Sequence, residues 1–233
     1  MRIALFGYGK MGKAIERIAL QRGHRIITKV DTPEDTIDYK EVDVAIDFST
    51  PQAAFNNISS ALNNHTPIVS GTTGWLERYD EITKLCNNKK GSFIYASNFS
   101  LGVNLFFELN KYLAKLTQNF DYEPHIIETH HTQKLDAPSG TAITLAEQIL
   151  PFSSKKQWKL NTDNPKNLNI IAKRLKDVPG THQIIYNSTI DEIEIKHTAK
   201  SREGFALGAV MAAEYIVNKK GIFTMKDVLG LKM

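Results

Sequence analysis

The stretch that decides the fold is RIALFGYGKMG, residues 2–12. Its first part, RIALFG (2–7), is an apolar run with the length of a buried strand, and KAIERIALQRG (13–23) continues with the spacing of a helix. The glycines between them form the pattern G-x-G-x-x-G and are Gly7, Gly9 and Gly12. Glycine at these positions permits a tight turn, close approach of a phosphate to the main chain, and close helix–strand packing.

A second strand, RIITKVD (25–31), ends on an acidic residue. Asp31 lies 19 residues beyond Gly12, where dinucleotide-binding domains place the carboxylate that binds a ribose. The order strand, glycine loop, helix, strand and acid predicts dinucleotide binding; an acid that only ends a strand in a turn is the alternative for Asp31. Thr32 follows, and no adjacent arginine is present to bind a 2′-phosphate, which favours NADH over NADPH.

Further apolar runs alternate with helical segments through the first hundred residues. They are DVAIDFS (43–49), PIVSGTTG (67–74) and SFIYASN (92–98). Strands separated by helices predict a parallel sheet covered on both faces, so we expect a Rossmann-like doubly wound α/β domain. The small residues of GTTG (71–74) and ASNFS (96–100) follow two of these strands, where they either line the nicotinamide ribose or serve as ordinary turn residues.

The second half of the chain has a different pattern. GVNLFFELNKYLAKL (102–116) and FALGAVMAAEYIV (205–217) have helical spacing, HIIETHH (125–131) is strand-like, and the polar segment 151–168 is interpreted as a surface loop. Three segments alternate apolar and polar residues: 169–176, 182–189 and 191–198. This alternation predicts a second α+β domain with a mostly antiparallel sheet that has one buried face.

Composition narrows the class of protein. The 233 residues are 42% hydrophobic and 23% charged, and no apolar run is long enough to span a membrane. Cys86 is the single cysteine, so no internal disulfide is expected and a reducing cytoplasm is the simplest setting. A net charge of +4 suits small anionic ligands, whereas scattered lysine and arginine disfavour binding of nucleic acid.

The segment HIIETHHTQKLDAPSGTA (125–142) concentrates reactive side chains at the end of a strand. His130 and His131 are consecutive, so on a strand they point to opposite faces and at most one enters a given pocket. Lys134 follows in a loop, and a helix beginning at Gly140-Thr141 would favour a bound carboxylate. The alternative is a solvated basic loop; a metal site is not expected, because no His, Cys or Asp set has ligand spacing.

These segments together resemble the dihydrodipicolinate reductase family. The motifs that carry the resemblance are G-x-G-x-x-G, DFS, GTTG, SNFSLGVN, ETHHTQKLDAPSGTA and HTAKSREGFALGA. The resemblance implies reduction of a cyclic imine-type dicarboxylate by NAD(P)H with loss of water, which gives tetrahydrodipicolinate in diaminopimelate and lysine biosynthesis. It also implies a cytoplasmic homotetramer, assembled through the second sheet.

The resemblance further implies a domain division and residue roles. Residues 1–99 and 207–233 would form a discontinuous dinucleotide-binding domain, and residues 100–206 a domain for substrate binding and oligomerisation. His130 falls on the position of the catalytic proton donor or acceptor, and Lys134 on that of the catalytic lysine. The substrate-binding positions are His131, Gly140 and Thr141. The cofactor-binding positions are Gly7, Tyr8, Gly9, Lys10, Met11, Gly12, Asp31, Gly71, Thr72, Thr73, Ala96, Ser97, Asn98 and Phe99.

Two other functions share part of the pattern. A related two-domain dehydrogenase acting on an amino acid such as aspartate would carry the glycine loop, but gives no account of E-x-H-H-x-x-K followed by P-S-G-T. A dinucleotide-sensing protein without catalysis would not need Lys134. One departure from the family pattern lies in RLKDVPGTH (174–182), where Lys176 replaces a glycine and puts the shape of the loop in doubt.

Overall fold

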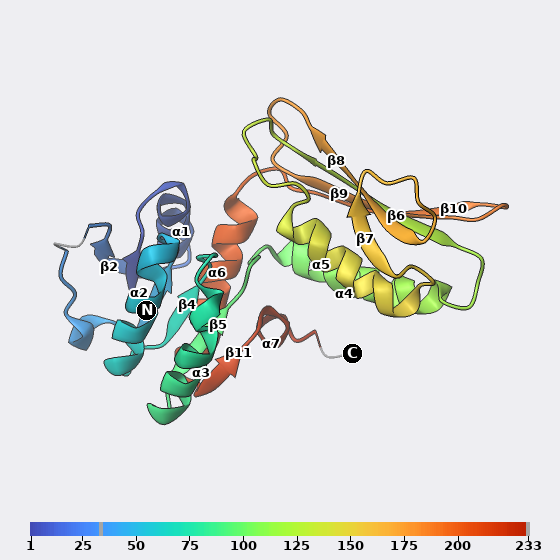
Figure 1. Cartoon of the computed structure of the whole chain (residues 1–233). Helices are drawn as coiled ribbons and strands as arrows, with labels where there is room; N and C mark the ends of the chain where they lie inside the picture. Colours follow the sequence, from blue (N-terminus) through green and yellow to red (C-terminus); the bar gives the residue numbers. More distant parts are fainter. Residues whose placement is uncertain (33–34, 232–233) are drawn as a thin grey trace. The chain divides into compact units, whose positions relative to one another are not determined.

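The computed structural model describes residues 1–32 and 35–231. The chain forms two compact units (Figure 1). Unit 1 comprises Met1–Leu101 and the segment that begins at Arg202, and unit 2 comprises Gly102–Ser201. The chain therefore leaves unit 1, builds all of unit 2, and returns.

Unit 1 contains a six-stranded sheet in the order β11-β5-β4-β3-β1-β2. Its strands are β1 (Arg2–Phe6), β2 (Arg25–Val30), β3 (Val44–Asp47), β4 (Ile68–Ser70), β5 (Ser92–Tyr95) and β11 (Gly221–Phe223). All pairings among them are parallel, which confirms the doubly wound α/β prediction. The strand order reverses at β1, between β2 and β3, and in such sheets ligands bind at the carboxyl ends beside this reversal.

Helices cover both faces of this sheet, because its strands alternate between two apolar cores. The helices are α1 (Lys10–Gln21), α2 (Pro51–Asn63), α3 (Tyr79–Asn88), α6 (Glu203–Ile216) and α7 (Met225–Leu229). Ile3 and Leu5 of β1 belong to one core with α1 and α6, whereas Ala4 and Phe6 belong to the other with α2 and α3. Cys86 is buried in α3, within the second core.

Helix α6 packs unusually close to the chain that leaves unit 1. A β-carbon placed on Gly208 of α6 would lie 1.7 Å from the carbonyl oxygen of Phe99. Alanines dominate the buried side of α6, among them Ala209 and Ala213. Small residues allow a helix backbone to approach its neighbour at this distance.

Unit 2 contains a five-stranded sheet in the order β10-β9-β6-β8-β7 (Figure 1). Its elements are α4 (Leu101–Thr117), β6 (Glu123–His130), α5 (Gly140–Ile149), β7 (Gln157–Leu160), β8 (Asn167–Arg174), β9 (Thr181–Asn187) and β10 (Glu192–Thr198). The sheet is mixed, since β6 pairs antiparallel with β9 but parallel with β8. The alternation of apolar and polar residues predicted a mostly antiparallel sheet. It does not reveal that β6 lies between β8 and β9.

The prediction of a surface loop over 151–168 was wrong in two parts, because residues 167–168 begin β8, with Leu168 fully buried, and a strand lies within the segment. Gln157–Leu160 form the edge strand β7, which pairs only with β8 within this sheet. An edge strand is paired on one side and exposed on the other, so its sequence need not be apolar. Trp158 alone of these four residues is partly buried, and it packs against the core of unit 2.

One face of the second sheet is covered by α4 and α5 (Figure 1). Ile126, Ile170 and Ile184 occupy neighbouring register positions of three strands and are fully buried beneath these helices. Ile127 and Ile171 are paired on the opposite face and are half-buried. Among the described residues, no helix is long and apolar enough to cross a membrane.

Candidate active site

The glycine loop of unit 1 has a separate physical reason for each glycine. Gly7 has a φ of +86°, and a β-carbon there would lie 2.3 Å from the carbonyl oxygen of Phe48. A β-carbon on Gly12 would lie 2.3 Å from the carbonyl oxygen of Gly7. At Gly9, which is exposed, a β-carbon would meet no atom within 4 Å. Gly7 and Gly12 are thus required by the fold, whereas Gly9 leaves open space at the amino end of α1.

Asp31, just beyond β2, reaches back to this loop. Its Oδ1 accepts a hydrogen bond of 2.7 Å from the main-chain N–H of Tyr8. The ammonium of Lys29 lies 4.1 Å from the centroid of the Tyr8 ring, and it also forms a 2.8 Å ion pair with Glu16. The carboxylate and the loop are therefore held together, and the nearest lysine of β2 is already paired with a carboxylate.

A buried acid joins the loops that follow β3 and β4. Asp47 has no exposed surface; it accepts hydrogen bonds from Ser49 Oγ (2.6 Å) and Ser70 Oγ (2.8 Å). Burial raises the pKa of Asp47, while hydroxyl and amide donors, including Asn57, oppose that rise. The sequence pattern does not indicate a role for Asp47, the acid of DFS, because its hydrogen-bond partners lie on separate elements.

The predicted cofactor residues after β4 and β5 differ in what they expose. Thr72 is buried and its Oγ1 accepts the main-chain N–H of Ser49 at 2.9 Å, and Phe99 is 1% exposed within the core. Thr73 and Ser97, by contrast, are exposed, as are Gly9 and Lys10 of the glycine loop. The side chains of Thr72 and Phe99 therefore stabilise the loops, and only their main chains are left to contact a ligand.

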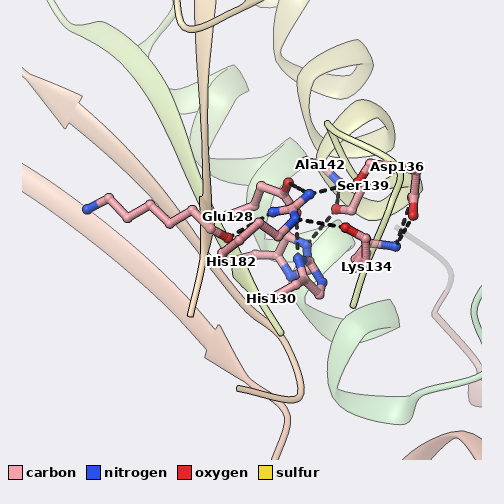
Figure 2. A network of polar contacts seen from close by, with 9 residues as sticks. Glu128, His130, Lys134, Asp136, Ser139, Ala142 and His182 are labelled. Atoms are coloured by element: carbon pink, nitrogen blue, oxygen red, sulfur yellow. Dashed lines mark hydrogen bonds and ion pairs between the residues drawn. The ribbon is translucent and has the colours of Figure 1, made fainter. Parts of the chain in front are cut away.

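In unit 2, strand β6 ends in a buried acid–histidine pair (Figure 2). Glu128 has no exposed surface, and its Oε2 lies 2.6 Å from Nδ1 of His130, although the ring N–H is not aligned with that contact. The other oxygen, Oε1, accepts a 2.9 Å hydrogen bond from Nη2 of Arg174. Residues 128 and 130 share one face of β6 because side chains on a strand alternate.

A second histidine completes this cluster from β9. The rings of His182 and His130 form an edge-to-face pair with centroids 5.1 Å apart. Nε2 of His182 lies 3.0 Å from Oγ of Ser139, which accepts the N–H of Ala142 and so caps α5 (Figure 2). His182 thus connects the acid–histidine pair to the amino end of α5.

Electrostatics fix the charge state of two of these groups. Burial alone would raise the pKa of Glu128, but contacts from His130, Arg174 and Ser139 outweigh it and hold the pKa at about 2. Burial lowers the pKa of His182 to about 3, and the neighbouring His130 acts in the same direction. Near neutral pH the cluster therefore contains an ionised Glu128 and a neutral His182.

The loop after β6 contains Lys134, and Arg174 of β8 holds it by hydrogen bonds. Nζ of Lys134 lies 2.8 Å from both carboxylate oxygens of Asp136, and this contact lowers the pKa of Asp136 (Figure 2). Arg174 donates through Nη2 to the carbonyl oxygen of Asp136 at 2.7 Å and through Nε to that of Lys134 at 3.4 Å. His130 and Lys134 are therefore both tied to Arg174, one through Glu128 and the other through the loop.

The remaining predicted residues of unit 2 surround the same strand end. His131 is half-buried, its carbonyl oxygen accepts the N–H of Lys134 at 3.1 Å, and its Nδ1 is buried without a hydrogen-bond partner among the described residues. Gly140 and Thr141 begin α5, where helix N–H groups have no intrahelical acceptors. A β-carbon on Gly140 would meet nothing within 4 Å, so this helix end is open.

Glu128, His130 and His182 also have the chemistry of a metal-binding set. One ligand-type atom from each lies within 4.8 Å of the others. Spacing along the chain did not reveal this group, because His182 comes from a different strand. The guanidinium of Arg174 contacts Oε1 of Glu128, and its positive charge opposes a second cation there.

A dinucleotide-binding unit joined to an α+β unit that carries a histidine–lysine site defines the chain as a two-domain, nicotinamide-dependent oxidoreductase. Residues 1–99 match the family described as dihydrodipicolinate reductase, N-terminus, and residues 102–229 match its C-terminal counterpart. The chain therefore belongs to the dihydrodipicolinate reductase family, as its motifs predicted.

Individual relatives agree with this assignment. A 4-hydroxy-tetrahydrodipicolinate reductase from Christiangramia forsetii is 57% identical, over 99% of this chain and 98% of the relative. The dipicolinate-bound dihydrodipicolinate reductase from Paenisporosarcina sp. TG-14 superposes with a TM-score of 0.76 at 25% identity, covering 96% of this chain and 97% of the other. Aspartate dehydrogenase from Thermotoga maritima is similar in fold alone, with a TM-score of 0.50 and 13% identity over 96% of this chain and 99% of the other.

Proposed function

We propose that His130 and Lys134 are the proton-transferring groups of a 4-hydroxy-tetrahydrodipicolinate reductase. In this reaction one hydride and one proton enter a cyclic imine dicarboxylate and one molecule of water leaves, giving tetrahydrodipicolinate for diaminopimelate and lysine biosynthesis. The nicotinamide cofactor supplies the hydride. The protein's part is to bind the dicarboxylate, to supply the proton, and to assist departure of the hydroxyl group.

The observation that carries the proposal is that one network of contacts through Arg174 holds both His130 and the loop of Lys134. His130 contacts Glu128, whose other oxygen binds Arg174, and Arg174 also binds the main chain on either side of Leu135 in the loop of Lys134. Two proton-carrying side chains held by one rigid network suit a reaction that requires defined positions for proton transfer. A protein that only senses a dinucleotide has no need of this arrangement.

We assign the substrate carboxylates to His131 and to the amino end of α5 at Gly140 and Thr141. The N–H groups of a helix end and the helix dipole favour a bound anion. Gly140 supports this assignment because the space beside it is open, so an anion can approach the main chain. Lys134 adds positive charge close to the same loop.

The fourteen cofactor positions of unit 1 are proposed on the same basis. The space beside Gly9 fits close approach of a pyrophosphate, and Asp31 presents a carboxylate next to the loop. Asp31 would repel a 2′-phosphate, and Lys29 of β2 already forms an ion pair with Glu16. We therefore propose a preference for NADH, with NADPH as a weaker alternative.

We further propose that the protein is a cytoplasmic homotetramer assembled through the sheet of unit 2. Ile127 and Ile171 are paired on the sheet face opposite α4 and α5, and Ile185 of β9 lies across from His125, two register positions from Ile127. Apolar residues on a face without covering helices favour contact with another copy of the chain. The single cysteine, buried in α3, is compatible with a reducing compartment.

The experiment that tests the function is turnover with purified protein and enzymatically generated 4-hydroxy-tetrahydrodipicolinate. Loss of absorbance at 340 nm is expected with NADH, and at a lower kcat/KM with NADPH. NADH formation that depends on aspartate would instead identify an amino-acid dehydrogenase, and nucleotide binding without turnover would identify a sensor. An NADPH preference above about tenfold would overturn the proposed cofactor preference; light scattering of the purified protein tests the tetramer.

A further inference from the structure

A fully buried carboxylate needs a reason to be ionised in the interior of unit 2. Glu128 has no exposed surface, yet its pKa is held at about 2. Desolvation makes a buried ion pair a poor source of stability, so Glu128 and Arg174 are not explained as a stabilising pair alone. The two oxygens of Glu128 lead instead to two different parts of the proposed site.

We propose that Glu128 and Arg174 are positioning residues that orient His130 and the loop of Lys134 as one unit. This inference rests on the proposed catalytic roles of His130 and Lys134. Neither Glu128 nor Arg174 is required to touch the substrate. Their function is to fix which ring nitrogen of His130 carries a proton and where the ammonium of Lys134 lies.

The first of the two proposed effects concerns Glu128 and the imidazole of His130. Oε2 of Glu128 lies 2.6 Å from Nδ1 of His130, although the ring N–H does not point at it in this structure. A carboxylate at Nδ1 favours the tautomer with the proton on Nδ1, which leaves Nε2 as the nitrogen that exchanges a proton with a ligand.

The absence of a side chain on Gly180 leaves room beside the Nε2 edge of the ring. A β-carbon on Gly180 would lie 3.1 Å from Nε2 of His130 and 3.2 Å from Cδ2. Any other residue at position 180 would therefore press on the reactive edge of the ring. His182, two residues further along, contacts the same ring edge-to-face, so both neighbours from this segment restrict its rotation.

The second effect concerns Arg174 and the loop of Lys134. Nη2 of Arg174 donates to Glu128 at 2.9 Å and to the carbonyl oxygen of Asp136 at 2.7 Å, while Nε reaches the carbonyl oxygen of Lys134. A planar guanidinium makes these contacts simultaneously, whereas the single ammonium of lysine does not reproduce them. Asp136 in turn holds Nζ of Lys134, which extends this network of contacts to the ammonium group.

Three single variants test the inference. Glu128→Gln removes the negative charge at nearly constant volume. Arg174→Lys keeps the positive charge but removes the planar guanidinium that makes several hydrogen bonds at once. The matched control is Glu108→Gln, another buried carboxylate of unit 2 that pairs with a cation, Lys111, at 3.6 Å on α4. We expect kcat to fall by about 10–100-fold in the first two variants, and by less than about twofold in the control. NADH affinity and the KM for the dicarboxylate should change by less than about threefold.

Non-additivity separates positioning from a merely structural role. In a His130→Ala background, Glu128→Gln is expected to cause a smaller loss of kcat than in the wild type, because the part of its effect that passes through the imidazole is already gone. A further loss of the full 10–100-fold would overturn the inference. Near-wild-type turnover of both Glu128→Gln and Arg174→Lys would overturn it as well.

The tautomer of His130 gives a readout that a change in stability would not move. Magic-angle-spinning ¹⁵N spectra of histidine-labelled protein, with His130 assigned by its loss in His130→Gln, should show the Nδ1–H form in the wild type. Glu128→Gln should shift this population towards Nε2–H, and Glu108→Gln should not. An unchanged tautomer in Glu128→Gln would contradict the proposal.

Folding and the proposed function are controlled separately. Circular dichroism checks each variant; if Glu128→Gln fails to fold, Arg174→Lys decides, since the Arg174 side chain is 20% exposed and Glu128 stays in place. His130→Ala alone tests the proposed function, and normal turnover in it would overturn both ideas. Severe loss in His130→Ala beside normal turnover in Glu128→Gln and Arg174→Lys would overturn the positioning role alone.

Discussion

The main-chain oxygen of Gly7 occupies the space that a side chain on Gly12 would need, since a β-carbon there would lie 2.3 Å from it. Heavy atoms do not approach this closely without moving the loop. Gly9, two residues from Gly7, has no such neighbour. The same motif therefore contains a glycine required for folding and a glycine required, in our proposal, for ligand approach.

Gly12→Ala and Gly9→Ala should therefore fail in different ways. In an ordinary helix, alanine is more favourable than glycine by about 1 kcal/mol, so a lower Tm of Gly12→Ala would identify the clash. Gly9→Ala should keep the Tm within about 1 °C but weaken NADH binding at least about tenfold, because the methyl group meets the pyrophosphate. Calorimetry and fluorescence titration measure the two effects; full NADH affinity in Gly9→Ala would contradict the assignment.

His130→Ala and Lys134→Ala should each lower kcat by about 10²–10⁴-fold, the usual contribution of a positioned acid or base. NADH affinity should hardly change, because both residues belong to unit 2 and the proposed nucleotide site to unit 1. Lys176→Ala is the matched control, as Lys176 is an exposed lysine in a nearby turn of the same unit. Near-normal turnover in both test variants would remove the catalytic assignment.

Asp31→Ala should weaken NADH binding by about tenfold while kcat at saturating NADH stays within about twofold. Asp31→Asn separates two causes, because it keeps an acceptor for the N–H of Tyr8 but removes the charge. Both variants should raise the ratio of kcat/KM for NADPH to that for NADH, since a repulsive carboxylate has gone. An unchanged ratio would show that Asp31 does not face the ribose.

The pKa of about 3 for His182 predicts loss of stability in mild acid. In the unfolded chain His182 takes up a proton near its ordinary pKa of about 6.5, whereas the folded state excludes it down to about pH 3. Between these values the unfolded state binds more protons, so the free energy of unfolding falls by about 1.4 kcal/mol per pH unit as pH decreases. Glu128 adds loss only below its unfolded value of 4.5, towards pH 2.

Urea unfolding at pH 7.0 and 5.5 measures this effect in His182→Gln and in the wild type. Glutamine keeps a polar group near Ser139 but does not titrate, so the variant should lose about 1–2 kcal/mol less across the interval. Trp158 reports on unit 2 and Trp75 on unit 1, so a Trp75→Phe background isolates the relevant transition. Equal losses in both proteins would show that His182 is not the buried neutral histidine.

Much of unit 1 was predictable because its signals are local. The glycine loop, the strand that precedes it and Asp31 lie within one βαβ segment. The left-handed residue near Lys176 is Asp177, with a φ of +59°, rather than Lys176 itself. The replacement of glycine by Lys176 therefore imposes no unusual backbone angle there.

The parts that sequence missed depend on contacts between distant segments. In the sequence Glu128 is recognisable only as one residue of a motif, because its partners His130, Arg174 and Ser139 contact it only in the folded protein. Asp47 was missed for the same reason, since its donors come from the loop after β3, from α2 and from β4. Strand β7 was missed because an edge strand has no strong apolar period.

The path of the chain has a consequence for its synthesis. The first core of unit 1 is incomplete until α6 supplies Ala206, Ala209, Val210 and Ala213, yet α6 follows the whole of unit 2. On the ribosome, the first hundred residues must therefore wait with one face of their sheet covered by α1 but not by α6 while the second unit emerges and folds. A nascent chain that stalls before Glu203 lacks α6, so this part of the apolar core stays accessible to chaperones.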